Sequence, residues 1–375
     1  MTVYLAGFAL SLFLVYYSEC KDFRGKNARI AIFLAILIPC LIAGLRDKTV
    51  GTDVGVYVEP LFLAARSESS FFAFWESSFS VNDWSISYVS DFEIGFTVLC
   101  YISAKLFGNL QVLLFAIQAF TVIPIYKGLR AFSKHQPVWI GMAVYYFLFF
   151  NQTLNMMRQW IAMAFLFYAF QFLVSKKYRR YFAFLLMAML FHFTAIWGIF
   201  IFVSYRLTVG HRASSNRWGT ILLVLLGLFA ILSLDVWVQL LKWLGLRYDH
   251  YISGSLQMMP RQIYYRIPII LLLLWRWKYL KEKDPSARFY IVMLVYDLLA
   301  SQLTSIFVQS GRIGLYFSEY CMLAYPALCV SSVSKKNRQI MRIITLCYLL
   351  VYWLYVYEYG NSSSTVPYIS CFAAS

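Results

Sequence analysis

Long apolar stretches recur along the whole chain and are separated by short polar stretches that carry most of the charge. Many of the apolar stretches approach the ~20 residues that a helix needs to cross a ~30 Å hydrocarbon core. Only helices and closed barrels satisfy their backbone hydrogen bonds in lipid, and runs of this length favour helices. The pattern therefore predicts an all-α fold, a polytopic transmembrane helical bundle of about 10–12 membrane segments that forms one integral membrane domain over residues 1–375.

Two of the predicted segments do not fit a simple alternation of inside and outside loops. Residues 94–107 are short for a crossing, and residues 181–204 have basic clusters at both ends. At ~1.5 Å per residue the longer segment would span ~36 Å, which favours a full crossing, whereas its flanking charges favour a re-entrant segment. Both interpretations stay open, and a broken segment at membrane depth would mark a cavity. The predicted segments are residues 2–18, 30–45, 94–107, 110–126, 137–150, 159–174, 181–204, 218–234, 262–277, 289–309, 313–333 and 343–359.

Composition and charge support a membrane protein and orient it. The chain is 61% hydrophobic and 13% charged, about half the charge of an ordinary soluble domain, which is ~25% charged. Its net charge of +16 comes from short Lys and Arg clusters between apolar runs, which is typical of cytoplasmic loops and not of a nucleic-acid-binding surface. Residues 46–93 carry eight acidic residues against three basic ones, so we expect an extracytoplasmic loop there and a second one at residues 235–261.

Three arginines stand near or within apolar segments, where a charge is costly and a functional role is the default interpretation. Arg46 follows the second segment, Arg158 lies between amides and an apolar run, and Arg312 is in the string SGRIGLYF. Simple interfacial anchoring is the competing explanation, and it fits Arg46 better than Arg158. Three guanidinium groups on the outer side suit a diphosphate, because each offers a planar fork to phosphate oxygens. Tyr316 shares a helical face with Arg312, and Asn155, Arg158 and Gln159 occupy about one and a half helical faces, so Asn155, Gln159 and Tyr316 are predicted to support binding.

Three further side chains are candidates for accepting a proton. Glu93 opens a segment, so an acidic helix start explains it equally well, and a pairing with an Arg is the other alternative. His192 stands at the centre of residues 181–204, where a hydrogen bond to a neighbouring helix is as good an explanation as a proton relay. Asp53 is slightly favoured as the base because it follows the flexible Gly51 on the segment that carries Arg46. The histidines have no metal-ligand spacing and there is no nucleotide-binding glycine loop, so we predict neither a metal nor a cofactor.

Taken in order, five strings resemble the EpsG-like family of Wzy-type polysaccharide polymerases, which lengthen exopolysaccharide, capsule or O-antigen chains. Each string is weak by itself, but together they cover most of the chain. The strings are Leu45-Arg46 through Asp53 and Tyr57, then Phe92 to Phe96, Asn155 to Ala162, Leu190 to His192, and Arg312 to Phe317.

The resemblance implies a glycosyltransferase in the bacterial plasma (inner) membrane, a multi-pass protein that uses undecaprenyl-diphosphate-linked oligosaccharides as donor and acceptor at the outer face. A chain-length regulator and a flippase are the protein partners that it implies. By this resemblance the three arginines would hold the diphosphate and Asp53, Glu93 or His192 would be the base. A flippase or other transporter of lipid-linked glycan, or a membrane acyltransferase using His192, is the alternative that the residues leave open.

Overall fold

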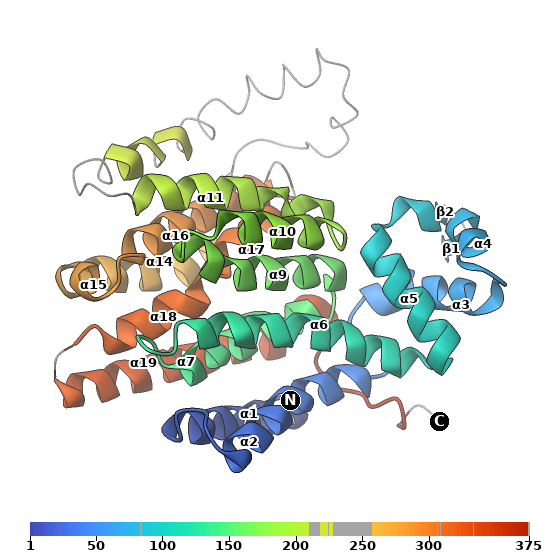
Figure 1. The fold of residues 1–375 in the computed structure, drawn as a ribbon, viewed down its shortest axis with the longest axis horizontal. Coiled ribbons are helices and arrows are strands. Elements are labelled where there is room, and N and C mark those ends of the chain that lie inside the picture. Colours follow the sequence, from blue (N-terminus) through green and yellow to red (C-terminus); the bar gives the residue numbers. More distant parts are fainter. Residues whose placement is uncertain are drawn as a thin grey trace. The chain divides into compact units, whose positions relative to one another are not determined.

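The computed structural model describes residues 1–82, 85–209, 218–223, 225–227, 257–305, 307, 309–332 and 334–373. Helices make up most of these residues, and the described strands form one two-stranded hairpin (Figure 1). The prediction of an all-α polytopic bundle is confirmed. Contacts divide the chain into unit 1, Met1–Ala195 with Ile344–Ser375, and unit 2, Ile196–Ile343.

Within the described residues, six helices are both long and apolar enough to cross a membrane. Ile94–Phe107 and Phe193–Thr208 are apolar but shorter. The predicted loop at residues 235–261 lies outside the described residues up to residue 256, as do residues 224 and 228–234 of the predicted segment 218–234. The six candidate spans are Thr2–Cys20 (α1), Lys26–Gly44 (α2), Leu110–Ala131 (α6), Met157–Val174 (α9), Ser310–Val330 (α17 and α18) and Lys335–Tyr359 (α19 and η7).

The first two helices form a hairpin whose contact face consists of small residues. On α2 the buried positions Ala28, Ala31 and Ala35 recur every three or four residues, so they share one face toward α1. The Ser11 hydroxyl of α1 donates to the Ala35 carbonyl at 2.8 Å, and that of Ser18 donates to the Ala28 carbonyl at 3.1 Å. Small residues and hydroxyl groups are what lets helices approach closely in lipid, where no hydrophobic force drives them together.

Helix α9 is the most buried of the candidate spans in unit 1 and packs between α6 and Tyr178–Met189 (α10). The predicted segment 137–150, which precedes α9 in the chain, forms a helix with a π-helical turn between two α-helical parts. This helix ends before Asn155, and α9 starts at Met157, so the polar string that contains Arg158 lies at a helix break. The three parts of the helix are Val138–Val144 (α7), the π-helical turn Tyr145–Phe149 (η3) and Phe150–Thr153 (α8).

The polar stretch between α2 and residue 94 has a compact structure of its own. Buried apolar residues such as Leu61, Phe62 and Phe74 hold it against Ile94–Phe107 (α5), and Figure 1 shows these elements gathered beside α5. A continuous apolar run does not mark this core, because its residues are spread over short amphipathic pieces. The elements are Val54–Val58 (η1), Glu59–Ser67 (α3), Phe71–Glu76 (α4), Ser78–Asn82 (β1) paired antiparallel with Ser85–Tyr88 (β2), and Val89–Asp91 (η2).

The predicted segment 181–204 is broken near its middle. Helix α10 ends at Met189, a 3₁₀ turn follows at Phe193–Ile196 (η4), and Trp197–Thr208 (α11) resumes the helix in unit 2. His192 therefore lies in the break and not inside a continuous helix. The break is the irregular backbone that the sequence left open for this segment.

Unit 2 contains Arg312 and Tyr316 on Ser310–Ser318 (α17). Arg312 is exposed and Tyr316 is buried. Helix α17 packs against Ala287–Gln302 (α16). An ion pair joins α16 to Pro260–Trp275 (α14), because Nε of Arg266 on α14 donates to Oδ2 of Asp297 on α16 at 2.8 Å. The remaining elements of this unit are Trp277–Lys283 (α15), Leu303–Ser305 (η6) and Cys321–Val330 (α18).

Candidate functional site

Three of the predicted site residues meet at one point in unit 1. Glu93 accepts from Nη1 of Arg158 at 2.5 Å through Oε2, and its Oε1 lies 2.6 Å from Nδ1 of His192. The backbone N–H of Phe193 also donates to Oε1, at 3.1 Å. The three side chains are only about one fifth exposed, so they interact largely out of water. A carboxylate bound by two cationic or polar side chains and a backbone donor is rigidly held.

Local backbone features bring these three groups together. Glu93 caps the start of α5, Arg158 is in the first turn of α9, and His192 is in the break after α10. The N–H of Gly95 donates to the Leu190 carbonyl at 2.7 Å, which ties the start of α5 to the break. A Cβ atom at Gly95 would lie 2.7 Å from that carbonyl oxygen, so glycine permits this close approach.

The pKa of Glu93 shows which influences dominate at the site. Burial by itself raises the pKa of this carboxyl, but the hydrogen bond with His192 and the charge of Arg158 outweigh burial and lower it to about 2. Glu93 is therefore ionised at neutral pH. Its charge is already committed to two partners, which makes it a poor proton acceptor and a good positioning group for His192.

Two aromatic rings cover the guanidinium group of Arg158. Its central carbon lies 4.6 Å from the ring centroid of Phe92 and 5.2 Å from that of Tyr57. Cations bind favourably over aromatic faces, so these rings fix the orientation of the Arg158 side chain. The guanidinium group has five N–H donors, and its contacts with Glu93 and Tyr57 use only part of them.

Tyr57 links Asp53 to this cluster. Its hydroxyl group hydrogen-bonds with both Asp53 and Arg158, and burial together with the charge of Asp53 raises the pKa of Tyr57. The phenol is therefore neutral and can donate. From the sequence Tyr57 had no predicted role, although it lies four residues after Asp53, a spacing at which helical side chains meet.

Arg46 is placed differently from Arg158. Its side chain is 1% exposed, and its Nη1 and Nη2 donate to the carbonyl groups of Ala43 and Leu154, each at 3.0 Å. Burial lowers the pKa of Arg46 to about 10, so it keeps its charge at neutral pH. In this arrangement Arg46 donates to the last turn of α2 and to the backbone that leads into Arg158.

The C-terminal tail holds the loop that follows Arg46, a feature with no signal in the sequence. The Gly51 N–H donates to the Ser364 carbonyl at 2.8 Å, and the amide of Asn155 accepts from the Thr52 N–H at 2.7 Å while donating to the Ser363 carbonyl. Gly51 has φ +88°, and a Cβ atom there would lie 2.5 Å from Oδ1 of Asn155. Gly51 is thus fixed, so its flexibility provides no argument for Asp53 as the base.

The other predicted site residues lie apart from this cluster or in unit 2. Gln159 is buried on α9, with its amide 3.8 Å from the sulfur of Met163. Arg312 and Tyr316 belong to α17 of unit 2. Across the described parts of the chain, no three His, Cys, Asp or Glu side chains lie close enough together to hold a metal ion.

The fold and the site define a multi-pass helical membrane protein with a cluster of Glu93, Arg158 and His192 at two helix breaks. The chain belongs to the EpsG family, whose sequence model matches residues 29–370. This confirms the resemblance seen in the five strings. Polysaccharide polymerase activity of the glycosyltransferase type, on lipid-linked oligosaccharides in a membrane, is associated with the family as a whole. No curated protein and no solved structure gives a significant match.

Proposed function

We propose that this protein is a polysaccharide polymerase of the bacterial plasma membrane that uses undecaprenyl-diphosphate-linked glycans at the outer face. It transfers the glycan of the donor to a hydroxyl group of an undecaprenyl-diphosphate-linked repeat unit. The observation that carries this proposal is the cluster of Glu93, Arg158 and His192, in a member of a polymerase family.

In the proposed reaction a hydroxyl oxygen of the acceptor attacks the anomeric carbon of the donor glycan. The bond between that carbon and the diphosphate oxygen breaks, and undecaprenyl diphosphate leaves with the electron pair. Arg158 stabilises the charge that grows on the leaving diphosphate through its remaining N–H donors. The contribution of Arg312 and Tyr316, which belong to unit 2, stays a prediction from the sequence, as does the supporting role of Gln159. Arg46 contributes positive charge beside the backbone that leads into Arg158. Asn155 fixes the loop that follows Arg46.

The proton of the acceptor hydroxyl goes to His192 in this proposal. Because Glu93 binds Nδ1, a neutral His192 carries its lone pair on Nε2, which makes no hydrogen bond within the described chain. A carboxylate that holds one imidazole nitrogen while the other accepts a proton is the arrangement of many acid–base sites. Glu93 and Asp53 are the competing bases; both already have hydrogen-bond partners.

The test compares neutral replacements of the three candidates in a deletion strain. His192→Gln should cut polymerisation by ~10²–10⁴-fold, the usual contribution of a general base. Asp53→Asn should reduce it less, and Glu93→Gln should fall between them because it only loosens His192. The exposed His135→Gln serves as a matched control. The glycan ladder is the readout, with equal protein levels shown by immunoblot.

The membrane face on which single repeat units accumulate in the deletion strain separates a polymerase from a flippase. Loss of a polymerase leaves single repeat units on lipid at the outer face, whereas loss of a flippase leaves them at the inner face. Long glycan at normal levels in the deletion strain would refute the proposed function. Near-normal ladders from all three variants would leave the arginines alone to account for catalysis.

A further inference from the structure

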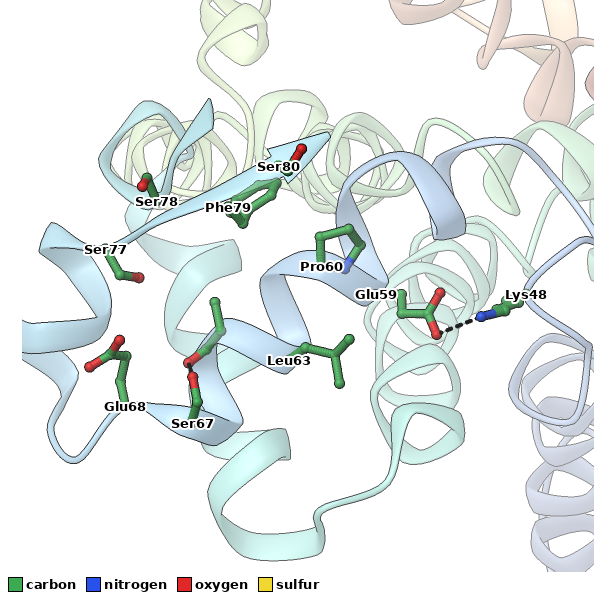
Figure 2. A pocket seen from close by; sticks show the side chains of 11 residues that line it. Lys48, Glu59, Pro60, Leu63, Ser67, Glu68, Ser77, Ser78, Phe79 and Ser80 are labelled. Carbon is green, nitrogen blue, oxygen red and sulfur yellow. Dashed lines mark hydrogen bonds and ion pairs between the residues drawn. The ribbon is translucent and has the colours of Figure 1, made fainter. Parts of the chain in front are cut away.

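An open groove of about 670 Å³ lies within unit 1, between α3 and the hairpin strand β1 (Figure 2). Helix α3 contributes Glu59 and Leu63, and the strand contributes Ser78 and Phe79. A volume of this size is within the ~300–1,000 Å³ range of small-ligand sites. None of these side chains belongs to the cluster around Arg158.

The polar side chains of the groove are mainly hydrogen-bond acceptors. Ser67 and Ser77 donate their hydroxyl protons to the carbonyl groups of Ala64 and Phe74, at 3.0 and 2.8 Å, so their oxygen lone pairs remain for a ligand. The carboxylate of Glu68 adds further acceptors. A ligand rich in hydroxyl donors would match this lining.

The charges of the groove exclude a diphosphate. Two carboxylates, Glu59 and Glu68, stand against one ammonium group, Lys48, so the lining has a net charge of −1. Lys48 is bound to Glu59 at 3.1 Å, as the dashed line in Figure 2 shows. An anionic headgroup would be repelled, whereas a neutral or basic ligand would not.

An apolar strip runs through the same groove. Leu63 is 52% exposed, and Figure 2 shows it between the carboxylates of Glu59 and Glu68, near Pro60. Sugar rings have hydroxyl groups at their edges and C–H groups on their faces, so they suit a lining that alternates acceptors with apolar surface. An acyl or polyprenyl chain would offer no hydrogen-bond donor to the carboxylate of Glu68.

Aromatic packing connects the groove to the Arg158 cluster. The ring of Phe79 borders the groove and lies 5.8 Å from the ring of Phe92. Phe92 in turn lies beneath the guanidinium group of Arg158 and precedes Glu93. One aromatic layer therefore separates the groove from the cluster.

We propose that this groove binds the saccharide of a lipid-linked repeat unit, with a preference for neutral or basic sugars over acidic ones. This proposal rests on the proposed function, because a polymerase is what would bring lipid-linked repeat units to the groove. It adds a saccharide site outside the reactive cluster, and Glu68 and the β1 serines would determine its specificity.

The probe is the oligosaccharide released by mild acid from the lipid-linked repeat units of the host cell. Its binding to the purified full-length protein is measured by calorimetry and by saturation-transfer NMR. Glu68→Lys and Ser78→Trp should each raise the Kd by at least ~10-fold, a loss of ~1.4 kcal/mol. The control Glu76→Lys makes the same charge change at an exposed residue outside the groove and should leave the Kd unchanged. Glu68→Gln, the smaller change, should weaken binding by ~3-fold if Glu68→Lys fails to fold.

Arg158→Lys distinguishes a failure of the groove proposal from a failure of the proposed function. It should reduce polymerisation by at least ~10-fold while leaving the Kd for the free oligosaccharide within ~2-fold of wild type. Wild-type affinity in Glu68→Lys and Ser78→Trp would overturn the groove proposal even if Arg158→Lys blocks polymerisation. Conversely, groove-dependent binding in a protein whose deletion leaves polymer unchanged would support the saccharide site and refute the polymerase.

Discussion

At the scale of single residues, the site is built around the carboxylate of Glu93, whose charge faces that of Arg158. Glu93 takes one cation, Arg158, and one imidazole, His192, so the group that could compete for a proton is held as an anion. Arg158 keeps donors for a ligand, whereas Arg46 uses two of its nitrogens on backbone carbonyls. The two arginines therefore have different tasks, although the sequence presents them alike.

The first prediction concerns the guanidinium fork of Arg158. Arg158→Lys should reduce polymerisation by at least ~10-fold, because an ammonium group keeps the charge but loses the planar contact with phosphate and with the Phe92 ring. The glycan ladder of the complemented deletion strain measures this. Arg179→Lys, an exposed substitution of the same kind, should behave as wild type. A full-length ladder from Arg158→Lys would exclude the diphosphate role.

The second prediction concerns stability against pH. The folded-state pKa of Glu93 is about 2, below its ordinary value of 4.5, so its interactions stabilise the fold fully above pH 4.5 and are lost as pH falls toward 2. The shift corresponds to about 3 kcal/mol. The stability advantage of wild type over Glu93→Gln should therefore be constant from pH 8 to 5 and shrink below pH 4.5. Thermal unfolding in detergent measures it, and an advantage independent of pH down to 2.5 would contradict the assignment.

At the scale of elements, two breaks in helices create the site. The chain leaves helical geometry between α8 and α9 and again between α10 and η4, and Arg158 and His192 lie beside these breaks. Irregular backbone at membrane depth needs polar partners from elsewhere. Here Glu93 and Gly95, at the start of α5, supply them, so α5 acts as the support of the site although it is too short for an ordinary crossing.

The third prediction tests this support. Gly95→Ala should separate α5 from Leu190, because the added methyl group would meet the carbonyl oxygen at 2.7 Å. We expect a loss of at least ~1 kcal/mol of stability, as for other overpacked positions, and a matching loss of polymer. Gly55→Ala is the control, since nothing lies within 4 Å of its Cβ position. Equal melting temperatures and equal ladders for the two variants would show that the close approach is not needed.

At the scale of the whole molecule, the chain is a multi-pass membrane protein with a structured polar segment between α2 and α5. This segment carries Asp53 and Tyr57, and it forms the groove of Figure 2. Its excess of acidic residues predicts that it lies outside the cytoplasm. The proposed reaction requires that location, because the lipid-linked substrates are at the outer face.

The fourth prediction is the side of the membrane on which this segment lies. Ser70 caps α4 through its side chain, so the adjacent exposed Ser69 is the better position for a cysteine. In a background without the exposed Cys20 and Cys347, Ser69→Cys should react with a membrane-impermeant maleimide on intact spheroplasts. Lys336→Cys, in a predicted cytoplasmic cluster, should react only after the membrane is opened. The reverse result would refute the topology and the proposed site together.

The sequence by itself determined the fold class, the bounds of some apolar helices, the family and the candidate residues. These follow from local pattern, because the free energy of placing a segment in lipid depends on that segment's own apolar length. Residues 94–107 show this directly, since the predicted bounds are those of α5. The same local reasoning could not foresee α3, α4 and the hairpin, whose apolar residues are scattered over short elements.

Only the tertiary structure decided which candidates act together. Glu93 meets Arg158 across 65 positions of sequence and His192 across 99, and the tail reaches Asn155 across 208. No local pattern encodes such pairings, because they depend on where helices break and how closely backbones approach at Gly95 and Gly51. The charge of each residue was visible in the sequence. Its partner, and therefore its task, was set by the packing of α5, α9 and the break after α10.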